Sequence, residues 1–148
     1  MSDTATRQVL AALREGFEGP GKVGYFLDSD AGLLRTLGNL SAEEASRERG
    51  GNSVAAHAGH ILFGLDAFAA FIAGDHTQRD WNESWRLGTV DEDAWKRLQA
   101  DLGRGYETLR TAIKTHAATS DEAMGGAVAG VAHLAYHLGA IRQKLTFG

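Results

Sequence analysis

Two histidines, His133 and His137, lie four residues apart near the end of the chain, within a stretch typical of a helix. Four residues advance an α-helix by about 400°, so the two imidazoles lie about 40° apart and one turn above the other. A single metal ion can bind two imidazoles in that geometry. The pair therefore indicates part of a metal site, whose further ligands must come from another stretch of the chain.

The same spacing has a simpler interpretation, in which the two histidines are independent, one exposed and one satisfied by a hydrogen bond. On a helical wheel both lie at the edge of an apolar stripe, which is formed by Leu134, Leu138, Ile141 and Leu145. Their neighbours Ala129, Gly130 and Ala132 are small, so another helix can approach closely here. The spacing alone leaves both interpretations open.

A second pair, His57 and His60, lies near the start of another predicted helix. On the wheel His57 falls inside or beside the apolar stripe and His60 at its edge, which favours His57 as the buried member without excluding His60. Burying several imidazoles without a metal or hydrogen-bond partners is costly, so two such pairs favour one shared site. We interpret His76 and His116 as solvated surface histidines.

Arg142 and two tryptophans are further candidates. Arg142 falls within the apolar stripe of its helix, which favours either a structural ion pair with a carboxylate or a contact with an anionic substrate. Trp81 and Trp85 lie in a polar connection over residues 76–90. They either cover the site as a lid or fix this long connection to the core.

The composition narrows the class of protein. The chain has 148 residues, which favours one domain over 1–148, and its net charge of −4 makes nucleic acid an unexpected partner. It has no cysteine, which excludes disulfides, cysteine-bound zinc and a cysteine nucleophile. The first residues do not resemble a signal peptide, so we expect a cytoplasmic location. The longest apolar-rich stretch, around residues 67–73, is too short to predict a membrane span.

Helix signals dominate, because the single proline is Pro20 and β-branched alternation is scarce. Helices are predicted over about 4–17, around 33–40 with a restart at 41–44, over about 53–73, from a capping-box match at 89–92 to about 113, and from 119–122 to near 145. The expected fold class is all-α, a four-helix bundle with an extra short N-terminal helix. The long connection after residue 75 can cross the end of the bundle, which allows topologies other than up-down-up-down.

Two stretches, residues 53–61 (SVAAHAGHI) and 133–142 (HLAYHLGAIR), resemble the DinB/YfiT-like superfamily. The resemblance covers most of the chain and is strongest in the last helix. It implies an up-down-down-up four-helix bundle that holds a divalent metal with one histidine from the second main helix and an H-x-x-x-H pair from the fourth. In the family's register the ligands are His60, His133 and His137. Ala140 departs from the pattern, since glutamine is usual at that position.

The resemblance leaves His57 additional to the three ligands, as a fourth ligand, a hydrogen-bond donor to a ligand, or a substrate contact. Three neutral imidazoles leave a coordination position for water or substrate, as in catalytic zinc sites. Zinc or nickel suits imidazole, and iron and manganese are also compatible. The resemblance implies an enzyme with a small-molecule substrate: either a transferase or isomerase that uses a low-molecular-weight thiol as cosubstrate, or a metal-assisted hydrolase.

The alternative is a non-catalytic, stress-related bundle in which the metal is structural or incidental and the protein acts by dimerisation or partner binding. A large exposed apolar face on the first helix, or on the helix that carries Tyr106, would favour it. Members of the superfamily are often homodimers, and we expect a homodimer here as well.

Overall fold

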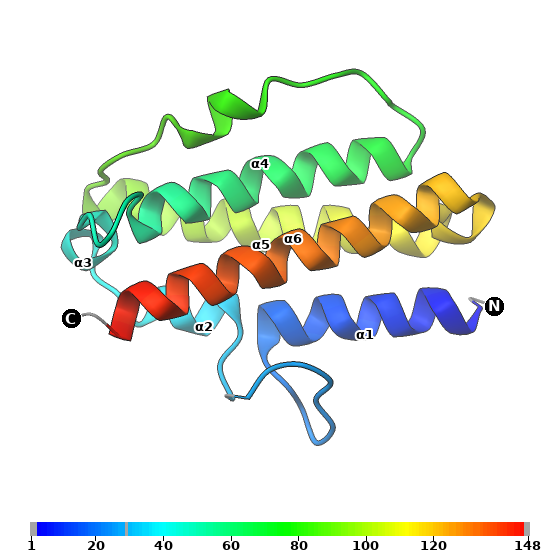
Figure 1. The fold of residues 1–148 in the computed structure, drawn as a ribbon, viewed down its shortest axis with the longest axis horizontal. Coiled ribbons are helices and arrows are strands. Elements are labelled where there is room, and N and C mark those ends of the chain that lie inside the picture. Colours follow the sequence, from blue (N-terminus) through cyan, green and yellow to red (C-terminus); the bar gives the residue numbers. More distant parts are fainter. Residues whose placement is uncertain (1–2, 29, 147–148) are drawn as a thin grey trace.

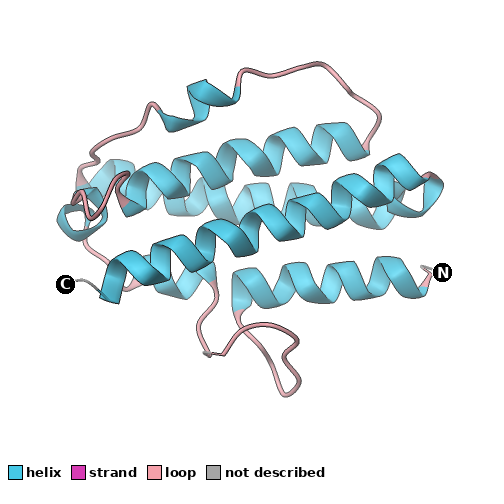
Figure 2. Cartoon of the chain, viewed as in Figure 1, coloured by secondary structure: helices cyan, strands magenta, loops and turns pink. Residues whose placement is uncertain are grey.

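The computed structural model describes residues 3–28 and 30–146, and within these ranges the chain is helical and contains no strand. Its α-helices are α1 (Thr4–Glu18), α2 (Leu33–Gly38), α3 (Ala42–Ser46), α4 (Val54–Ile72), α5 (Glu92–His116) and α6 (Asp121–Thr146). Two short 3-10 helices, η1 (Trp81–Trp85) and η2 (Ala117–Thr119), complete these elements (Figure 2). The expected all-α class is therefore confirmed.

The four long helices α1, α4, α5 and α6 lie side by side (Figure 1). α4 packs along both α5 and α6, and α1 packs along α6 and α5. Figure 1 shows that α1 and α6 run in one direction, whereas α4 and α5 run in the opposite direction. Because α4 and α5 are parallel neighbours, the connection between them returns along the outer side of α4, and η1 lies within this connection.

The apolar stripes of the helices meet in a common core. Its largest fully buried side chains are Trp95, Phe17, Leu13, Leu33, Leu37, Ile61, Leu102, Leu109, Ile113, Leu134, Leu138 and Ile141. The ring of Phe17 stacks on that of Tyr106 with centroids 4.2 Å apart, which joins α1 to α5. This core holds α4 against α6, the two helices that carry the histidine pairs.

Side-chain caps set where most of the helices begin. Ser41 forms the predicted capping box at the start of α3, and Ser53 caps α4 by accepting from a backbone N–H. The predicted starts of the last two helices were one or two residues early, since Asp91 caps α5 and Ser120 caps α6. The side chains of Asp91 and Ser120, which lie nearer to the helices, provide these caps. The capping boxes predicted to begin at residues 89 and 119 are therefore wrong by two residues and by one residue.

The expected short helix does not lie at the N-terminus. α1 has 15 residues and buries Leu13 and Phe17, so it is a full member of the core. The short helices are α2 and α3, which follow it and have six and five residues. They are short because α2 ends at Gly38 and Ser41 caps a new helix within a few residues.

By length and composition alone, α4 and α6 are each long and apolar enough to cross a membrane, so the stretch over residues 67–73 underestimated the apolar length of these helices. Core helices of water-soluble proteins pass the same test. Inside this protein, 61% of the apolar window of α4 and 39% of that of α6 are buried against other elements. Packing in the core therefore accounts for much of their apolar character, and the absence of a membrane partner stays a prediction.

Candidate metal centre

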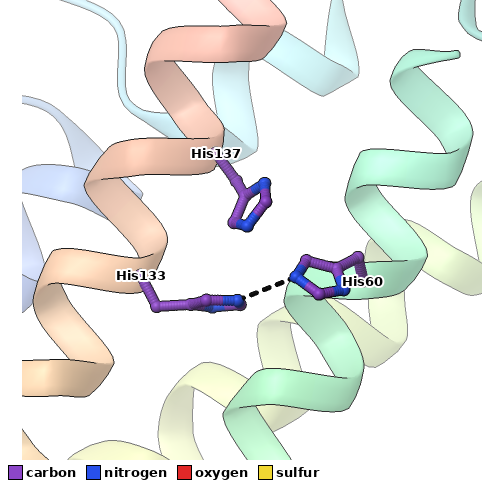
Figure 3. Close-up of side chains that lie close together, drawn as sticks. All are labelled: His60, His133 and His137. Atoms are coloured by element: carbon purple, nitrogen blue, oxygen red, sulfur yellow. Dashed lines mark hydrogen bonds between the residues drawn. The ribbon is translucent and has the colours of Figure 1, made fainter. Parts of the chain in front are cut away.

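His60 of α4 and His133 and His137 of α6 converge on one place, as Figure 3 shows. Each contributes one ring nitrogen to a group whose atoms all lie within 4.8 Å of one another. Nε2 of His60 is 2.9 Å from Nε2 of His133. His60 and His137 are buried and His133 is half-buried. The structure thus brings the two pairs to one cluster that could hold a metal ion.

The hydrogen bonds of Ser84 fix the tautomer of His60. Ser84 Oγ donates its proton to the carbonyl oxygen of Trp81, so toward His60 it can only accept. His60 Nδ1 lies 2.6 Å from Ser84 Oγ and must therefore carry the proton. The lone pair of His60 is left on Nε2, which faces His133. A metal-binding histidine is commonly oriented in this way, by donating its other ring N–H to a nearby acceptor.

His57 contacts His137 rather than joining the group of three. The two Nδ1 atoms are 3.1 Å apart, so one of them donates and the other accepts. When His137 uses Nε2 toward the cluster as a lone pair, its Nδ1–H donates to His57, and His57 carries its own proton on Nε2. His57 is also part of the wall of a cavity of about 680 Å³, together with Arg49, Lys144 and other residues. Of the three roles left open for His57, the nearest is that of a hydrogen-bond partner to a ligand, but in this tautomer His57 accepts the hydrogen bond instead of donating it.

A glycine of α4 makes room for the ring of His133. A Cβ atom added at Gly64 would lie 2.7 Å from Cε1 and 2.8 Å from Nδ1 of His133, which is closer than real contacts allow. Gly64 is one helical turn after His60, so it lies on the same face of α4. A side chain at this position would push His133 away from His60. The sequence signal was a glycine inside a helix, four residues after a candidate ligand, and it was missed.

Two tryptophans of η1 cover the histidines. The ring of Trp85 stacks on that of His60, with centroids 4.0 Å apart, and also meets His57 and His137 at 5.1 and 5.7 Å. Trp81 contacts His60 and His133 at 5.8 and 5.5 Å. The connection over residues 76–90 therefore lies across the cluster. These contacts are compatible with both interpretations of the tryptophans, a lid over the site and residues that fix the connection to the core.

Burial keeps the four histidines neutral. It lowers the pKa of His57 to about 4, and the nearby charges of Lys144 and His60 lower it as well. It also lowers the pKa of His133 to about 4, with a smaller contribution from His60. Burial, together with the neighbouring histidines, lowers the pKa of His137 to about 3. Burial also lowers the pKa of His60. His57, His133 and His137 are therefore neutral imidazoles well below neutral pH, and the pKa of His60 is shifted in the same direction. Neutral imidazole is the form that binds metal.

Arg142 lies elsewhere. Its Nη1 is 3.3 Å from Oδ1 of Asp28, in the loop between α1 and α2, and its side chain is half-buried. This contact is the ion pair with a carboxylate that was one of the two interpretations of Arg142. The structure does not bring this residue together with the histidines through any contact among the described residues, so we leave it out of the candidate site.

Comparisons with protein-family models, with curated proteins and with solved structures found no match to this chain. The cluster is therefore interpreted from its own geometry: three neutral imidazoles from two helices, one of them held in a defined tautomer, beneath two indole rings.

Proposed function

We propose that the chain is a metal-dependent protein of the DinB-like superfamily, in which His60, His133 and His137 hold one divalent metal ion. The helix directions fit the up-down-down-up topology that the resemblance implies, with α1, α4, α5 and α6 as the four helices of a bundle. The observation that carries the metal proposal is the Ser84–His60 hydrogen bond, because it leaves the His60 lone pair on the nitrogen that faces His133. A solvated histidine would have no need of this arrangement.

The donor set fits a metal ion with an open coordination position. Three imidazoles without a carboxylate or thiolate favour zinc or nickel, and they leave room for water or substrate. Such a metal, when bound, lowers the pKa of bound water and holds a thiol as thiolate. Within the chain, Ser84 and His57 orient two of the ligands, and the indoles of Trp81 and Trp85 limit access of water to the cluster.

The reaction we propose acts on a small molecule in the cytoplasm and belongs to one of two classes. The first uses a low-molecular-weight thiol. In transfer, the thiol loses its proton, its sulfur bonds to an electrophilic carbon, and the leaving group departs with the electron pair of the broken bond. In isomerisation, the thiol adds to the substrate and is released again from the rearranged product. The second is hydrolysis assisted by the metal. We favour the first, since the chain has no cysteine and an external thiol would supply the nucleophile.

The non-catalytic alternative receives less support. It would be favoured by a large exposed apolar face on α1 or α5, yet Tyr106 is buried, and no described residue of either helix is among the exposed large apolar side chains. α6 does carry Val128 and Tyr136, which are 52% and 75% exposed and two turns apart. We propose this face of α6 as the contact of the expected homodimer, to be tested by sedimentation of the Tyr136→Lys variant.

Metal content and metal affinity of histidine variants test the proposal. The purified protein is stripped of metal, reconstituted separately with zinc and nickel, and compared with His60→Ala, His133→Ala, His137→Ala and His57→Ala. We expect one ion per chain in the parent protein, loss of the ion in the first three variants, and a weakened but retained site in His57→Ala. His116→Ala is the matched control, because His116 ends α5 away from the cluster.

Two results would overturn the assignment. One is the absence of stoichiometric metal from every reconstituted preparation. The other is loss of metal in His57→Ala with full retention in His60→Ala. For the reaction class, the loaded protein is incubated with a low-molecular-weight thiol and an electrophile. Conjugation that requires metal supports thiol transfer, whereas cleavage of an ester without thiol supports hydrolysis.

A further inference from the structure

A second cavity of about 730 Å³ lies between the C-terminal half of α4, the start of the connection and the N-terminal part of α6. Its size is in the range of small-molecule sites. Phe68 and Trp81 form part of its wall, and the ring of each is 5.5 Å from that of His133 on the other side. We call this space the aromatic cavity. It adjoins the histidine cluster but contains none of the three proposed ligands.

Aromatic rings line the aromatic cavity in two pairs. Phe68 and Trp81 are 5.8 Å apart, and Phe71 stacks on His76 at 4.3 Å. Phe71 and Trp81 are 36% and 38% exposed, so part of each ring remains accessible to solvent. The facing surface of α6 is made of small residues, Gly125, Gly126 and Ala129. The cavity is thus bounded by aromatic side chains and by small residues of α6, and Phe71 reaches α6 at Gly126.

The charges around this space are predominantly negative. Asp75 and Glu122 line the cavity, and Arg79 is the one Arg or Lys residue among its described lining residues. Arg79 is already ion-paired with Asp66, which lies outside the lining, and its positive charge also lowers the pKa of Asp75 after the larger effect of the Thr77 hydrogen bonds. The carboxylates therefore outnumber the available positive charge at the mouth of the cavity.

We propose that the aromatic cavity binds a small organic cation, of the quaternary or aromatic ammonium class. The faces of tryptophan and phenylalanine rings attract cations through their quadrupoles, and this attraction grows when water is excluded. Asp75 and Glu122 add attraction for a positive charge and disfavour an anion of the same shape. The site goes beyond the proposed metal function and does not depend on it, since no wall residue is a proposed ligand.

The test uses metal-free protein, so that its result is separate from that of the metal site. Binding of benzyltrimethylammonium is measured by isothermal titration calorimetry and compared with benzyl alcohol and benzenesulfonate. We expect the cation to bind at least tenfold more tightly than the neutral compound, and the anion to bind most weakly. Equal binding of the cation and the neutral compound, or no binding of the cation, would overturn the proposal.

Two glycines of α6 provide a matched pair of variants that locate the binding. A Cβ atom at Gly125 or at Gly139 meets nothing within 4 Å, but only Gly125 lines the aromatic cavity. Leucine is a far better helix former than glycine, so neither substitution is expected to unfold α6. We expect Gly125→Leu to weaken binding of the cation at least tenfold and Gly139→Leu to leave it unchanged. Equal binding by the two variants would place the cation elsewhere and overturn the proposal.

A charge variant checks the electrostatic part. Glu122→Gln keeps the shape of the side chain and removes one negative charge at the mouth of the cavity, so we expect roughly threefold weaker binding of the cation and no change for benzyl alcohol. Glu107→Gln, on the exposed side of α5, is the control and is expected to bind like the parent. An unchanged affinity for the cation in Glu122→Gln would contradict the role of charge in the proposal.

Discussion

Ser84 and Gly64 act on the proposed ligands without binding metal themselves. Ser84 accepts the Nδ1 proton of His60, and Gly64 leaves space for the ring of His133. Both effects set the direction of a ring nitrogen, which decides whether three histidines can share one ion. At this scale the candidate site consists of the three proposed ligands and of the neighbours that hold their imidazoles in place.

The Ser84 hydroxyl is expected to raise the metal affinity. Ser84→Ala removes the acceptor for His60 Nδ1–H, so the proton is free to move to Nε2, where it competes with the metal. Loss of such a partner typically weakens metal binding about 10–100-fold. The affinity for zinc is measured by competition with a chromophoric chelator. Ser84→Thr keeps the hydroxyl and should recover most of the affinity, and an alanine variant with parent affinity would contradict the role of Ser84.

The space at Gly64 is also expected to matter for metal binding more than for folding. In Gly64→Ala the new methyl group would lie 2.7 Å from His133 Cε1, so the ring must move away from His60. We expect at least a tenfold loss of zinc affinity, as for other disturbed metal surroundings, while far-ultraviolet circular dichroism stays unchanged. Gly139→Ala is the control, because a Cβ there meets nothing within 4 Å. Equal zinc affinity of the two variants would exclude this role for Gly64.

The candidate ligands could be predicted from the sequence, but their roles could be predicted only in part. Helical spacing placed His133 and His137 together, and the resemblance to the DinB/YfiT-like superfamily indicated His60. The wheel favoured His57 over His60 for burial, yet both are buried, at 8% and 6% exposed. A wheel considers one helix at a time, whereas η1 covers His60 from outside that helix. Ser84 was not predicted, because its contact depends on the path of the connection.

At the scale of elements, the loop between α1 and α2 is organised by a buried carboxylate. Glu15 is 4% exposed and accepts three backbone N–H groups, those of Tyr25, Phe26 and Leu27, at 2.7 to 2.8 Å. Burial alone raises the pKa of Glu15, but the three hydrogen bonds together lower it by more, so the pKa lies below its usual value. The Arg142–Asp28 ion pair joins the same loop to α6. The loop is thus bound to the helices at two places.

We therefore expect Glu15→Gln to destabilise the protein. An amide keeps one acceptor and turns a donor toward backbone N–H groups, which loses charge-assisted hydrogen bonds inside the protein. The free energy of unfolding in urea should fall by about 2–3 kcal/mol, and amide hydrogen exchange at residues 25–27 should accelerate. Glu107→Gln serves as the exposed control. An unchanged unfolding midpoint for Glu15→Gln would show that the loop does not depend on this carboxylate.

Helices were predicted more closely than connections, for a local reason. Apolar periodicity and caps reside within each helix, so α1 and α4 begin and end within about one residue of the prediction. The hydrogen bonds that Glu15 accepts from residues 25–27, and the one that Ser84 accepts from His60, join stretches that lie 10 to 24 residues apart. No periodic pattern marks such contacts. This also explains why η1 was expected only as a polar connection with two tryptophans.

At the scale of the whole molecule, the histidine cluster joins two helices that are far apart in the sequence. His60 and His133 are 73 residues apart, and both lie in the tightly packed contact of α4 with α6. A metal that binds only the folded protein adds stability in proportion to the logarithm of its concentration, about 2.7 kcal/mol at one hundred times Kd. Without metal, the burial of these histidines makes the stability of the folded protein sensitive to acid.

The metal-free protein is therefore expected to lose stability as the pH falls below about 6.5. In the unfolded chain histidine protonates near that pH, whereas burial lowers the pKa of His57, His133 and His137 to about 4, 4 and 3 in the folded protein. Between these pKa values the unfolded state binds more protons than the folded state, so the free energy of unfolding decreases as the pH is lowered. The contribution of these three histidines stops changing below about pH 3 to 4.

Urea unfolding at pH 7, 6 and 5 measures this effect above the range in which carboxylates titrate. On the order of 1 kcal/mol should be lost for each buried histidine over this interval. Zinc at saturating concentration should raise the unfolding free energy at each pH, and a chelator should abolish the increase. The variant His137→Leu, measured without metal, should show a shallower pH dependence than the parent protein. The same slope in both proteins would mean that His137 is not held neutral by burial.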